Sequence, residues 1–363
     1  MSGRPTARAG IGRIRDHMLA TAESAVSDGI FIASNESVYG PGEKAQAAIV
    51  QSASRVERYP EDGTRRLSNA IGARFSLDPD KICCGFGSDD LLARLARAYL
   101  SPGDELVYPR HGYPKIANYA HANDAVPVGA GDSHFTPDID AILNSITERT
   151  RIVMLANPDN PAGTYVGDSE IRRLHGGLPS DVLLVLDSAY AEYVAAEDYE
   201  DPARLVDESS NVVMTRTFSK VFGLAGLRIG WLFGPHHIVD SLTRIGITFP
   251  ISVTALAACE AALEDRIHFE HVVRENGRVR ESFRCRLGTL GIEAIPSQTN
   301  FVLVRFADDQ EALSAQTFLE EHGVFARRLA AGGFSRCIRF TMGTEAEMNT
   351  CVEVLDAWVK GRG

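Results

Sequence analysis

The chain has 363 residues, of which 44% are hydrophobic and 23% are charged, and its formal net charge is −11. This length and composition suffice for a substantial buried core, divided between one large and one smaller domain. The negative charge argues against nucleic acid or an anionic membrane as a partner. No apolar run reaches membrane-spanning length and the N-terminus has no signal-peptide core, so we expect a cytoplasmic protein.

The six cysteines include no CxxC pair, and no histidine cluster accompanies them. A metal site is therefore not expected. Most of the cysteines lie in apolar contexts, which predicts buried free thiols in a reducing compartment.

Residues 82–95 predict a short strand, a glycine-containing turn and the start of a helix. Ser88 is a favourable N-cap, and the leucines that follow it form one apolar helical face. Free amides at the start of a helix bind phosphate readily. Plain helix capping, with Asp89 and Asp90 favourable to the helix dipole, is the other interpretation, and both can hold together.

Residues 151–156 predict a second strand, which ends in the polar turn Asn157-Pro158-Asp159-Asn160-Pro161. The Asn-Pro pairs keep the backbone out of a helix. An ordinary turn explains these residues, but the Asn160 amide can also donate a hydrogen bond to a ligand oxygen.

Residues 182–186 are apolar and predict a buried parallel strand, which Asp187 follows directly. Open α/β sheets bind ligands at the carboxyl ends of their strands. At that edge Asp187 can pair with a protonated pyridine nitrogen, and Tyr190 can hydrogen-bond a ring phenolate oxygen. A turn-capping aspartate and a core tyrosine are the alternatives.

Lys220 is the most informative residue because of its neighbours. It lies in Thr217-Phe218-Ser219-Lys220, after the apolar run 212–214, and Arg228 follows eight residues later. A lysine after a strand is usually a solvated loop residue. A lysine beside hydroxyls and an arginine, however, fits a Schiff base with the aldehyde of pyridoxal phosphate (PLP), whose phosphate the other groups would bind.

Predicted strands and helices alternate from residue 41 to residue 255, which favours an α/β fold with a doubly wound, mostly parallel sheet in a large PLP-binding domain. Residues 1–40 are expected to form an N-terminal arm. Residues 249–252 mark a junction, after which a long helical stretch, from residue 253 to about 290, leads into a small α+β domain. That domain is expected to span residues 256–363. Its predicted strands are 300–306 and 337–341.

In their order along the chain, these segments resemble the fold-type-I PLP-dependent aminotransferases, and among them the histidinol-phosphate aminotransferase branch. The resemblance extends from about residue 30 to residue 359. It rests on these stretches: Arg58-Tyr59-Pro60-Glu61, Gly87-Ser88-Asp89-Asp90, Asn157 to Thr164, Asp187-Ser188-Ala189-Tyr190, Thr217 to Lys220, Gly226-Leu227-Arg228 and Cys337 to Thr344.

The resemblance implies a role for each matched residue. Lys220 is implied to bind the cofactor aldehyde and to move protons, and Asp187 to pair with the pyridine nitrogen. Tyr190 and Asn160 are implied to hold the phenolate oxygen. The implied contacts with the cofactor phosphate come from Ser88, Asp89, Thr217, Ser219 and Arg228.

Tyr113 aligns with the aromatic residue that stacks on the cofactor ring, and His111 is a less favoured candidate. Tyr59 aligns with a tyrosine that reaches the cofactor phosphate of the neighbouring subunit, which implies a homodimer with shared active sites. Arg339 and Arg327 match arginines that bind the anionic end of the substrate. The alternation of Arg339 with apolar neighbours on a strand agrees with that role, and a structural salt bridge is the alternative.

The implied activity is PLP-dependent transamination of an amino substrate with 2-oxoglutarate or glutamate. Histidinol phosphate and an aromatic amino acid are both candidate donors, because Asp16 and His17 stand where this branch usually has a Pro-Tyr pair that helps hold the substrate phosphate. A PLP-dependent decarboxylase of a phospho-amino acid on the same fold is the alternative. A PLP-binding module of a transcription regulator is disfavoured, since only about forty residues precede the match.

Overall fold

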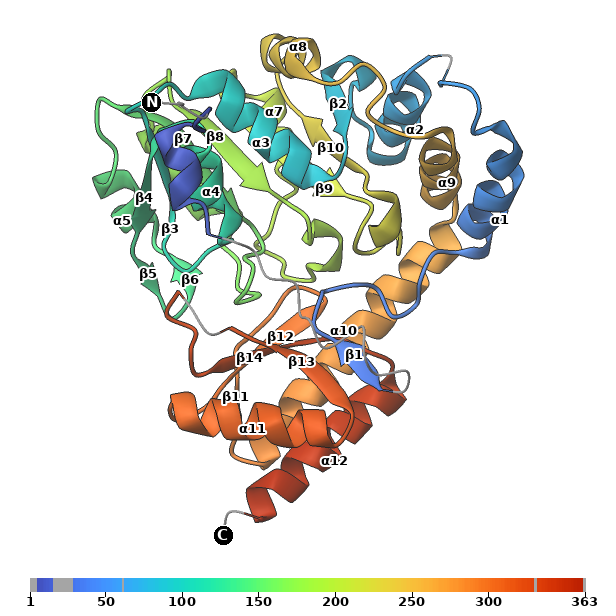
Figure 1. Cartoon of the computed structure of the whole chain (residues 1–363), viewed down its shortest axis with the longest axis vertical. Helices are drawn as coiled ribbons and strands as arrows, with labels where there is room; N and C mark the ends of the chain where they lie inside the picture. Colours follow the sequence, from blue (N-terminus) through green and yellow to red (C-terminus); the bar gives the residue numbers. More distant parts are fainter. Residues whose placement is uncertain (1–4, 16–28, 61, 330–331, 362–363) are drawn as a thin grey trace.

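The computed structural model describes residues 5–15, 29–60, 62–329 and 332–361. In Figure 1 the chain forms a large unit around one sheet and, below it, a smaller unit around a second sheet. Asp16 and His17 lie outside the described residues.

The large sheet has seven strands in the order β2-β10-β9-β8-β7-β3-β4. Neighbouring strands are parallel except at β10, which runs antiparallel to β2 and β9. The predicted α/β fold with a mostly parallel sheet is therefore confirmed. The strands are β2 (Ile82–Gly85), β3 (Glu105–Pro109), β4 (Val126–Ala130), β7 (Thr150–Ala156), β8 (Leu183–Asp187), β9 (Val212–Thr217) and β10 (Gly230–Phe233).

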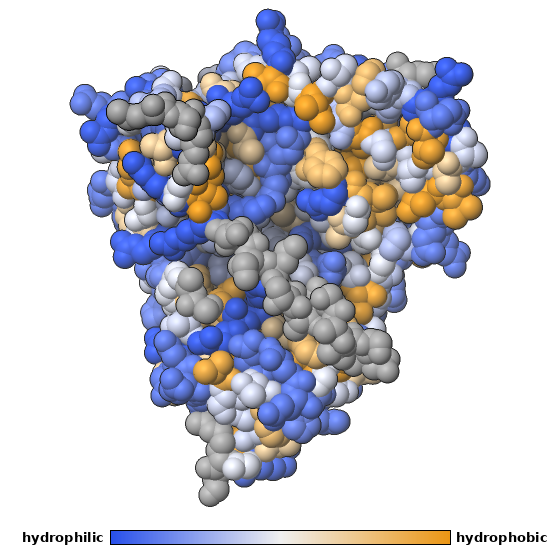
Figure 2. Space-filling model, viewed as in Figure 1, coloured by the Kyte–Doolittle hydropathy of each residue, from blue (hydrophilic) through white to orange (hydrophobic). Residues whose placement is uncertain are grey.

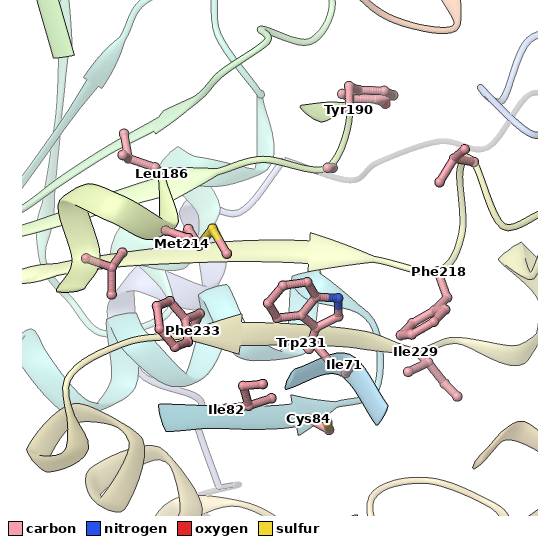
Figure 3. Packing of buried hydrophobic residues seen from close by; sticks show 14 of the residues in the cluster. Ile71, Ile82, Cys84, Leu186, Tyr190, Met214, Phe218, Ile229, Trp231 and Phe233 are labelled. Carbon is pink, nitrogen blue, oxygen red and sulfur yellow. The ribbon is translucent and has the colours of Figure 1, made fainter. Parts of the chain in front are cut away.

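Apolar side chains alternate between the two faces of this sheet, so helices cover both faces. Leu184 and Leu186 pack with α1, α2, α5, α6, α7 and α9, whereas Leu183 and Val185 pack with α3, α4 and α8. Figure 3 shows the first face, with side chains of β8, β9 and β10 and with Ile71 of α2. The helices are α1 (Glu43–Ser52), α2 (Arg65–Phe75), α3 (Ser88–Tyr99), α4 (Lys115–His121), α5 (Ile139–Asn144), α6 (Asp168–Gly177), α7 (Ala203–Asp207), α8 (His236–Ile245) and α9 (Val253–Glu264).

The small unit has a five-stranded sheet in the order β1-β13-β14-β12-β11. Its core gathers apolar residues from this sheet and from three helices. The predicted strands 300–306 and 337–341 correspond to β12 and β14. The elements are β1 (Ile30–Ile32), β11 (Glu293–Ala294), β12 (Phe301–Arg305), β13 (Val324–Arg328), β14 (Cys337–Thr341), α10 (Arg266–Thr289), α11 (Asp309–Glu321) and α12 (Glu345–Lys360).

The domain boundaries at residues 40 and 255 stay predictions. Two contacts favour a different assignment of the flanking elements. β1 pairs in parallel with β13, which groups residues 30–32 with the small sheet. α9 packs against α1 and α2, which groups it with the large unit.

Two local predictions need correction. The N-cap of α3 is Gly87, with a φ of +80°, and Ser88 is the first helical residue. The long helical stretch after residue 253 is two helices, because the backbone leaves the helical conformation at Asp265. The carboxylate of Asp265 accepts a hydrogen bond of 3.3 Å from the His268 amide and so caps α10.

All six cysteines are free thiols and five are buried, as the apolar contexts predict; Cys285 is exposed. Among the described residues, no helix combines the length and the apolar character that a membrane crossing requires.

Candidate active site

Polar residues at the carboxyl ends of neighbouring strands surround one cavity of about 320 Å³. β8 ends in Asp187, Asn160 follows β7, and Lys220 follows β9. The carboxyl ends of parallel strands meet at one edge of a sheet, which explains why these distant segments converge. The polar side chains that line the cavity include Ser88, Asp89, Tyr113, Asn160, Asp187, Tyr190, Thr217, Ser219, Lys220 and Arg228.

One end of this cavity is suited to an anion. Ser88 and Asp89, the first residues of α3, line the cavity there, and the main-chain amides of a first helical turn have no acceptor within their helix. The hydroxyl of Thr217 donates to that of Ser219 over 2.9 Å. The guanidinium of Arg228 donates to the same Ser219 hydroxyl over 3.3 Å. Amides, hydroxyls and one guanidinium therefore converge where a phosphate would be bound.

The carboxylate of Asp89 is held by three donors. It accepts hydrogen bonds from Lys115 Nζ at 2.6 Å, Tyr119 OH at 2.7 Å and Tyr113 OH at 3.0 Å. Burial opposes ionisation of Asp89, but these hydrogen bonds keep its pKa below the usual value. The carboxylate is thereby turned to its own partners, which leaves the main-chain amide as its contribution to the anion-binding end.

Asp187 is buried at the end of β8 and lines the same cavity. Burial raises its pKa to about 6, against the opposing effect of a 3.0 Å hydrogen bond from the Thr215 hydroxyl. A cation placed beside such a carboxyl lowers its pKa and keeps it ionised. Asp187 therefore offers a binding place for a protonated ring nitrogen.

Tyr190 and Asn160 form a polar pair on the cavity wall. The Tyr190 hydroxyl accepts a hydrogen bond of 3.0 Å from Asn35 Nδ2 and a longer one of 3.5 Å from Asn160 Nδ2. Burial raises the pKa of Tyr190 to about 12, although the positive charge of Arg339 works in the other direction. Tyr190 thus keeps its proton and can donate it in a hydrogen bond.

The amine of Lys220 lies between these groups. Its Nζ donates a hydrogen bond of 3.1 Å to the main-chain oxygen of Asn35 and lies 5.7 Å from the centre of the Tyr190 ring. Burial, together with the positive charge of Arg339, lowers the pKa of Lys220 to about 8. An amine with this pKa is partly unprotonated near neutral pH, which a nucleophile or a proton acceptor requires.

A second cavity, of about 680 Å³, shares Tyr113, Asn160, Tyr190 and Lys220 with the first. Five arginines line it, and no acidic side chain does so among the described residues. Arg339 donates to Asn160 Oδ1 at 2.7 Å and to the Ala33 oxygen at 2.9 Å. Burial lowers its pKa to about 10, so it stays positively charged at neutral pH. The five are Arg15, Arg110, Arg327, Arg328 and Arg339.

The comparisons with known proteins decide the family. Residues 27–355 match the sequence model described as aminotransferase class I and II. The chain belongs to this family. It is 46% identical over 331 residues to the histidinol-phosphate aminotransferase of Rhodospirillum centenum, with 91% of each chain covered. It is 42% identical over 362 residues to that of Rhodospirillum rubrum, with 99% of this chain and 98% of the other covered.

A solved structure agrees with these relatives. The histidinol-phosphate aminotransferase of Sinorhizobium meliloti, in complex with pyridoxal 5′-phosphate, superposes with a TM-score of 0.91 at 27% identity, and each chain is fully covered. The chain is thus a PLP-dependent aminotransferase. The first cavity fits this cofactor, since it combines a lysine amine, a buried carboxyl and an anion-binding end.

In this aminotransferase the structure brings together every predicted cofactor residue except Tyr59. Tyr59 is 74% exposed and stacks on Phe249 with ring centres 4.3 Å apart. Tyr113 lines both cavities. His111 does not line either one; its ring pairs with Asp132 and packs on Phe135 and Phe334.

The sequence does not predict two residues of the site, Asn35 and Arg15. Asn35 hydrogen-bonds both Lys220 and Tyr190, although its segment is expected to belong to the N-terminal arm. A signal existed, because polar residues follow the short apolar strand 30–32 just as they follow the other strands. Arg15 reaches the second cavity because Asn118 of α4 holds its main chain by two hydrogen bonds. No local pattern signals that contact.

Proposed function

We propose that this aminotransferase transfers an amino group between histidinol phosphate and 2-oxoglutarate, with glutamate as the amino product. The second cavity carries the proposal, because five arginines surround the approach to the Lys220 amine. Such a cavity favours substrates with an anionic group remote from the amine, a phosphate monoester or a second carboxylate, over a neutral aromatic side chain. The names of the relatives support the same substrate.

We further propose the following division of roles. Bound PLP supplies an aromatic ring that takes up electrons from the reacting carbon. Asp187 holds a proton on the ring nitrogen, and Tyr190 with Asn160 hydrogen-bonds the ring oxygen. Lys220 Nζ removes the proton from the substrate carbon that bears the amine, a task suited to its lowered pKa. The cofactor phosphate is bound by Ser88, Asp89, Thr217, Ser219 and Arg228. Tyr113 stacks on the ring. The substrate anion is bound by Arg339 and Arg327.

The test of the site is the Lys220→Ala variant of the full chain. We expect it to fold with an unchanged far-ultraviolet circular dichroism spectrum but to lose transamination and the lysine-dependent visible absorbance of the cofactor. Lys360→Ala, which alters an exposed lysine of α12, serves as the matched control and should keep both. A Lys220→Ala protein with full activity would refute the assignment.

The test of the substrate is a comparison of amino donors with 2-oxoglutarate as acceptor. Histidinol phosphate should give the highest kcat/KM, and phenylalanine a much lower one. A reversed order would make an aromatic amino acid the donor. Release of carbon dioxide from a phospho-amino acid, without glutamate formation, would instead identify the decarboxylase.

We also propose a homodimer that shares its active sites. Figure 2 shows hydrophobic residues gathered on the large unit over α1 and α9. Exposed apolar side chains there and nearby include Val50, Val56, Tyr59, Ile247 and Phe249. Apolar surface of this kind is typical of subunit contacts. The buried free thiols fit a reducing compartment, which supports the proposal of a cytoplasmic enzyme.

A further inference from the structure

Asn35 connects the two sheets at the site. It lies between β1 of the small sheet and α1 of the large unit, and it is 2% exposed. Its φ of +57° is left-handed, a conformation that asparagine tolerates better than most other residues. Uncommon backbone conformations persist where surrounding contacts hold them, and they cluster at functional sites.

The main-chain oxygen of Asn35 has both lone pairs engaged. It accepts one hydrogen bond of 3.1 Å from Lys220 Nζ and another of 3.1 Å from Asn300 Nδ2. Asn300 is itself 2% exposed and directly precedes β12. Asn300, directly before β12 of the small sheet, therefore holds in place the oxygen that accepts the hydrogen bond from the Lys220 amine.

The side chain of Asn35 has a donor on one side and an acceptor on the other. Its Nδ2 donates to the Tyr190 hydroxyl at 3.0 Å. Its Oδ1 accepts from the Thr341 hydroxyl at 3.2 Å, while its main-chain amide donates to that hydroxyl at 2.9 Å. Because Tyr190 accepts from Asn35, the proton of Tyr190 is free to point into the cavity.

Thr341 also connects Asn35 with Arg339, the arginine that we propose binds the substrate anion. Thr341 and Arg339 are two residues apart on β14 and so lie on the same face of the strand. Arg339 donates to the oxygen of Ala33, and Thr341 binds Asn35. Two hydrogen-bonded contacts therefore link the segment 33–35 to β14. One of them is made by Arg339, which lines the second cavity.

We propose that Asn35 is a positioning residue that couples β14 of the small sheet to the Lys220 amine and the Tyr190 hydroxyl. Its oxygen holds the amine in place whenever the amine is not bonded to the cofactor, and its amide sets the direction of the Tyr190 proton. The inference rests on the proposed roles of Lys220 and Tyr190.

The experiment uses the cofactor-loaded enzyme and follows its visible absorbance as a function of pH, with kcat, KM and thermal unfolding measured on the same samples. Asn35→Asp keeps the size of the side chain and tolerates the left-handed backbone. It replaces the donor to Tyr190 by an acceptor and adds a negative charge near Lys220. A nearby negative charge favours the protonated form, so the midpoint of the absorbance change should move to higher pH. We expect kcat to fall about tenfold or more, as for the loss of one oriented hydrogen bond, with a smaller change in KM.

A second pair of variants tests the coupling from the small sheet. Thr341→Val removes the hydroxyl that holds Asn35 at nearly unchanged shape, whereas Thr341→Ser retains it. The valine variant should lose several-fold in kcat and the serine variant should match the wild type. This pair decides the question alone if Asn35→Asp does not fold.

Three outcomes are distinct. A shifted absorbance midpoint in Asn35→Asp, with the valine effect rescued by serine, supports the inference. Variants that unfold at lower temperature but keep the wild-type midpoint and kcat would show a merely structural asparagine and overturn it. If the wild-type protein shows no absorbance that depends on Lys220, the proposed site itself fails, which Lys220→Ala reveals separately.

Discussion

At the level of single residues, Arg339 is proposed to bind the substrate and not the cofactor. It lines the second cavity and not the first. Its two terminal nitrogens are engaged by Asn160 and by the Ala33 oxygen, so a substrate anion would have to share or replace these acceptors. A guanidinium in this position binds a carboxylate or phosphate through paired hydrogen bonds.

We expect Arg339→Ala to raise the KM for the amino donor about 10- to 100-fold, the effect of losing a charged hydrogen bond. Cofactor affinity should stay close to that of the wild type. Arg339→Lys should be intermediate, because an ammonium keeps the charge without the paired geometry. Equilibrium titration with PLP beside steady-state kinetics makes the measurement; loss of the cofactor would mean that Arg339 is structural.

The buried carboxyl group of Asp159 makes the stability of the fold depend on pH. Burial raises its pKa well above the usual value of 3.8, against the opposing effect of the Ala162 and Asn160 amides. Below about pH 4 both the folded and unfolded chains keep this proton. Above that pH the unfolded chain loses it first, so the folded state is progressively destabilised until the pH passes the folded-state pKa.

The Asp159→Asn variant does not titrate at this position. Its free energy of unfolding, relative to the wild type, should therefore increase by about 1.4 kcal/mol for each pH unit above pH 4, up to the folded-state pKa. Urea unfolding of both proteins at about four pH values between pH 5 and pH 8 gives the comparison. A constant difference over this range would show that Asp159 is ionised when folded.

At the scale of the element, the position of α3 depends on one glycine of β10. A Cβ at Gly230 would lie 2.2 Å from the Ser88 nitrogen, so β10 and the start of α3 touch through main chain. This contact lies at the start of α3, whose residues Ser88 and Asp89 line the first cavity. The helix start and the strand are thus a single unit at the anion-binding end.

We expect Gly230→Ala to push α3 away and to weaken PLP binding, with a loss of about 1–3 kcal/mol in stability from overpacking. Gly176→Ala is the matched control, because a Cβ there meets no atom within 4 Å. PLP titration and thermal unfolding of both variants provide the test. Equal PLP affinity in the two variants would contradict the role of the close approach.

The sequence predicts elements best where local pattern and function coincide. Asp187, Asn160 and Lys220 each follow an apolar run, and the convergence of parallel strand ends brings them together. Asn35 also follows a short apolar strand, but its left-handed backbone and its partners at residues 300 and 341 are not encoded by any local pattern. The sequence does not distinguish Gly87 from Ser88 as the N-cap of α3, because both residues suit a helix start; in the structure Gly87 holds this position.

At the scale of the whole molecule, the proposed dimer explains the position of Tyr59. Its ring lies outside both cavities, 74% exposed, and rests on Phe249. A tyrosine so exposed contributes to the site only if it extends into another subunit. In a two-fold dimer each subunit would then supply Tyr59 to its partner's cofactor phosphate.

Mixed dimers test this exchange directly. Lys220→Ala and Tyr59→Ala subunits are unfolded together in equal amounts, refolded with PLP and assayed. In a hybrid dimer with shared sites, one site combines both substitutions and the other has neither, so activity should recover to about a quarter of the wild type with random pairing. If Tyr59 acts within its own subunit, every site in the hybrid is impaired and the mixture stays at the level of the separate variants. Sedimentation of the mixture confirms that dimers have formed, and therefore that an absent recovery reflects the site and not the assembly.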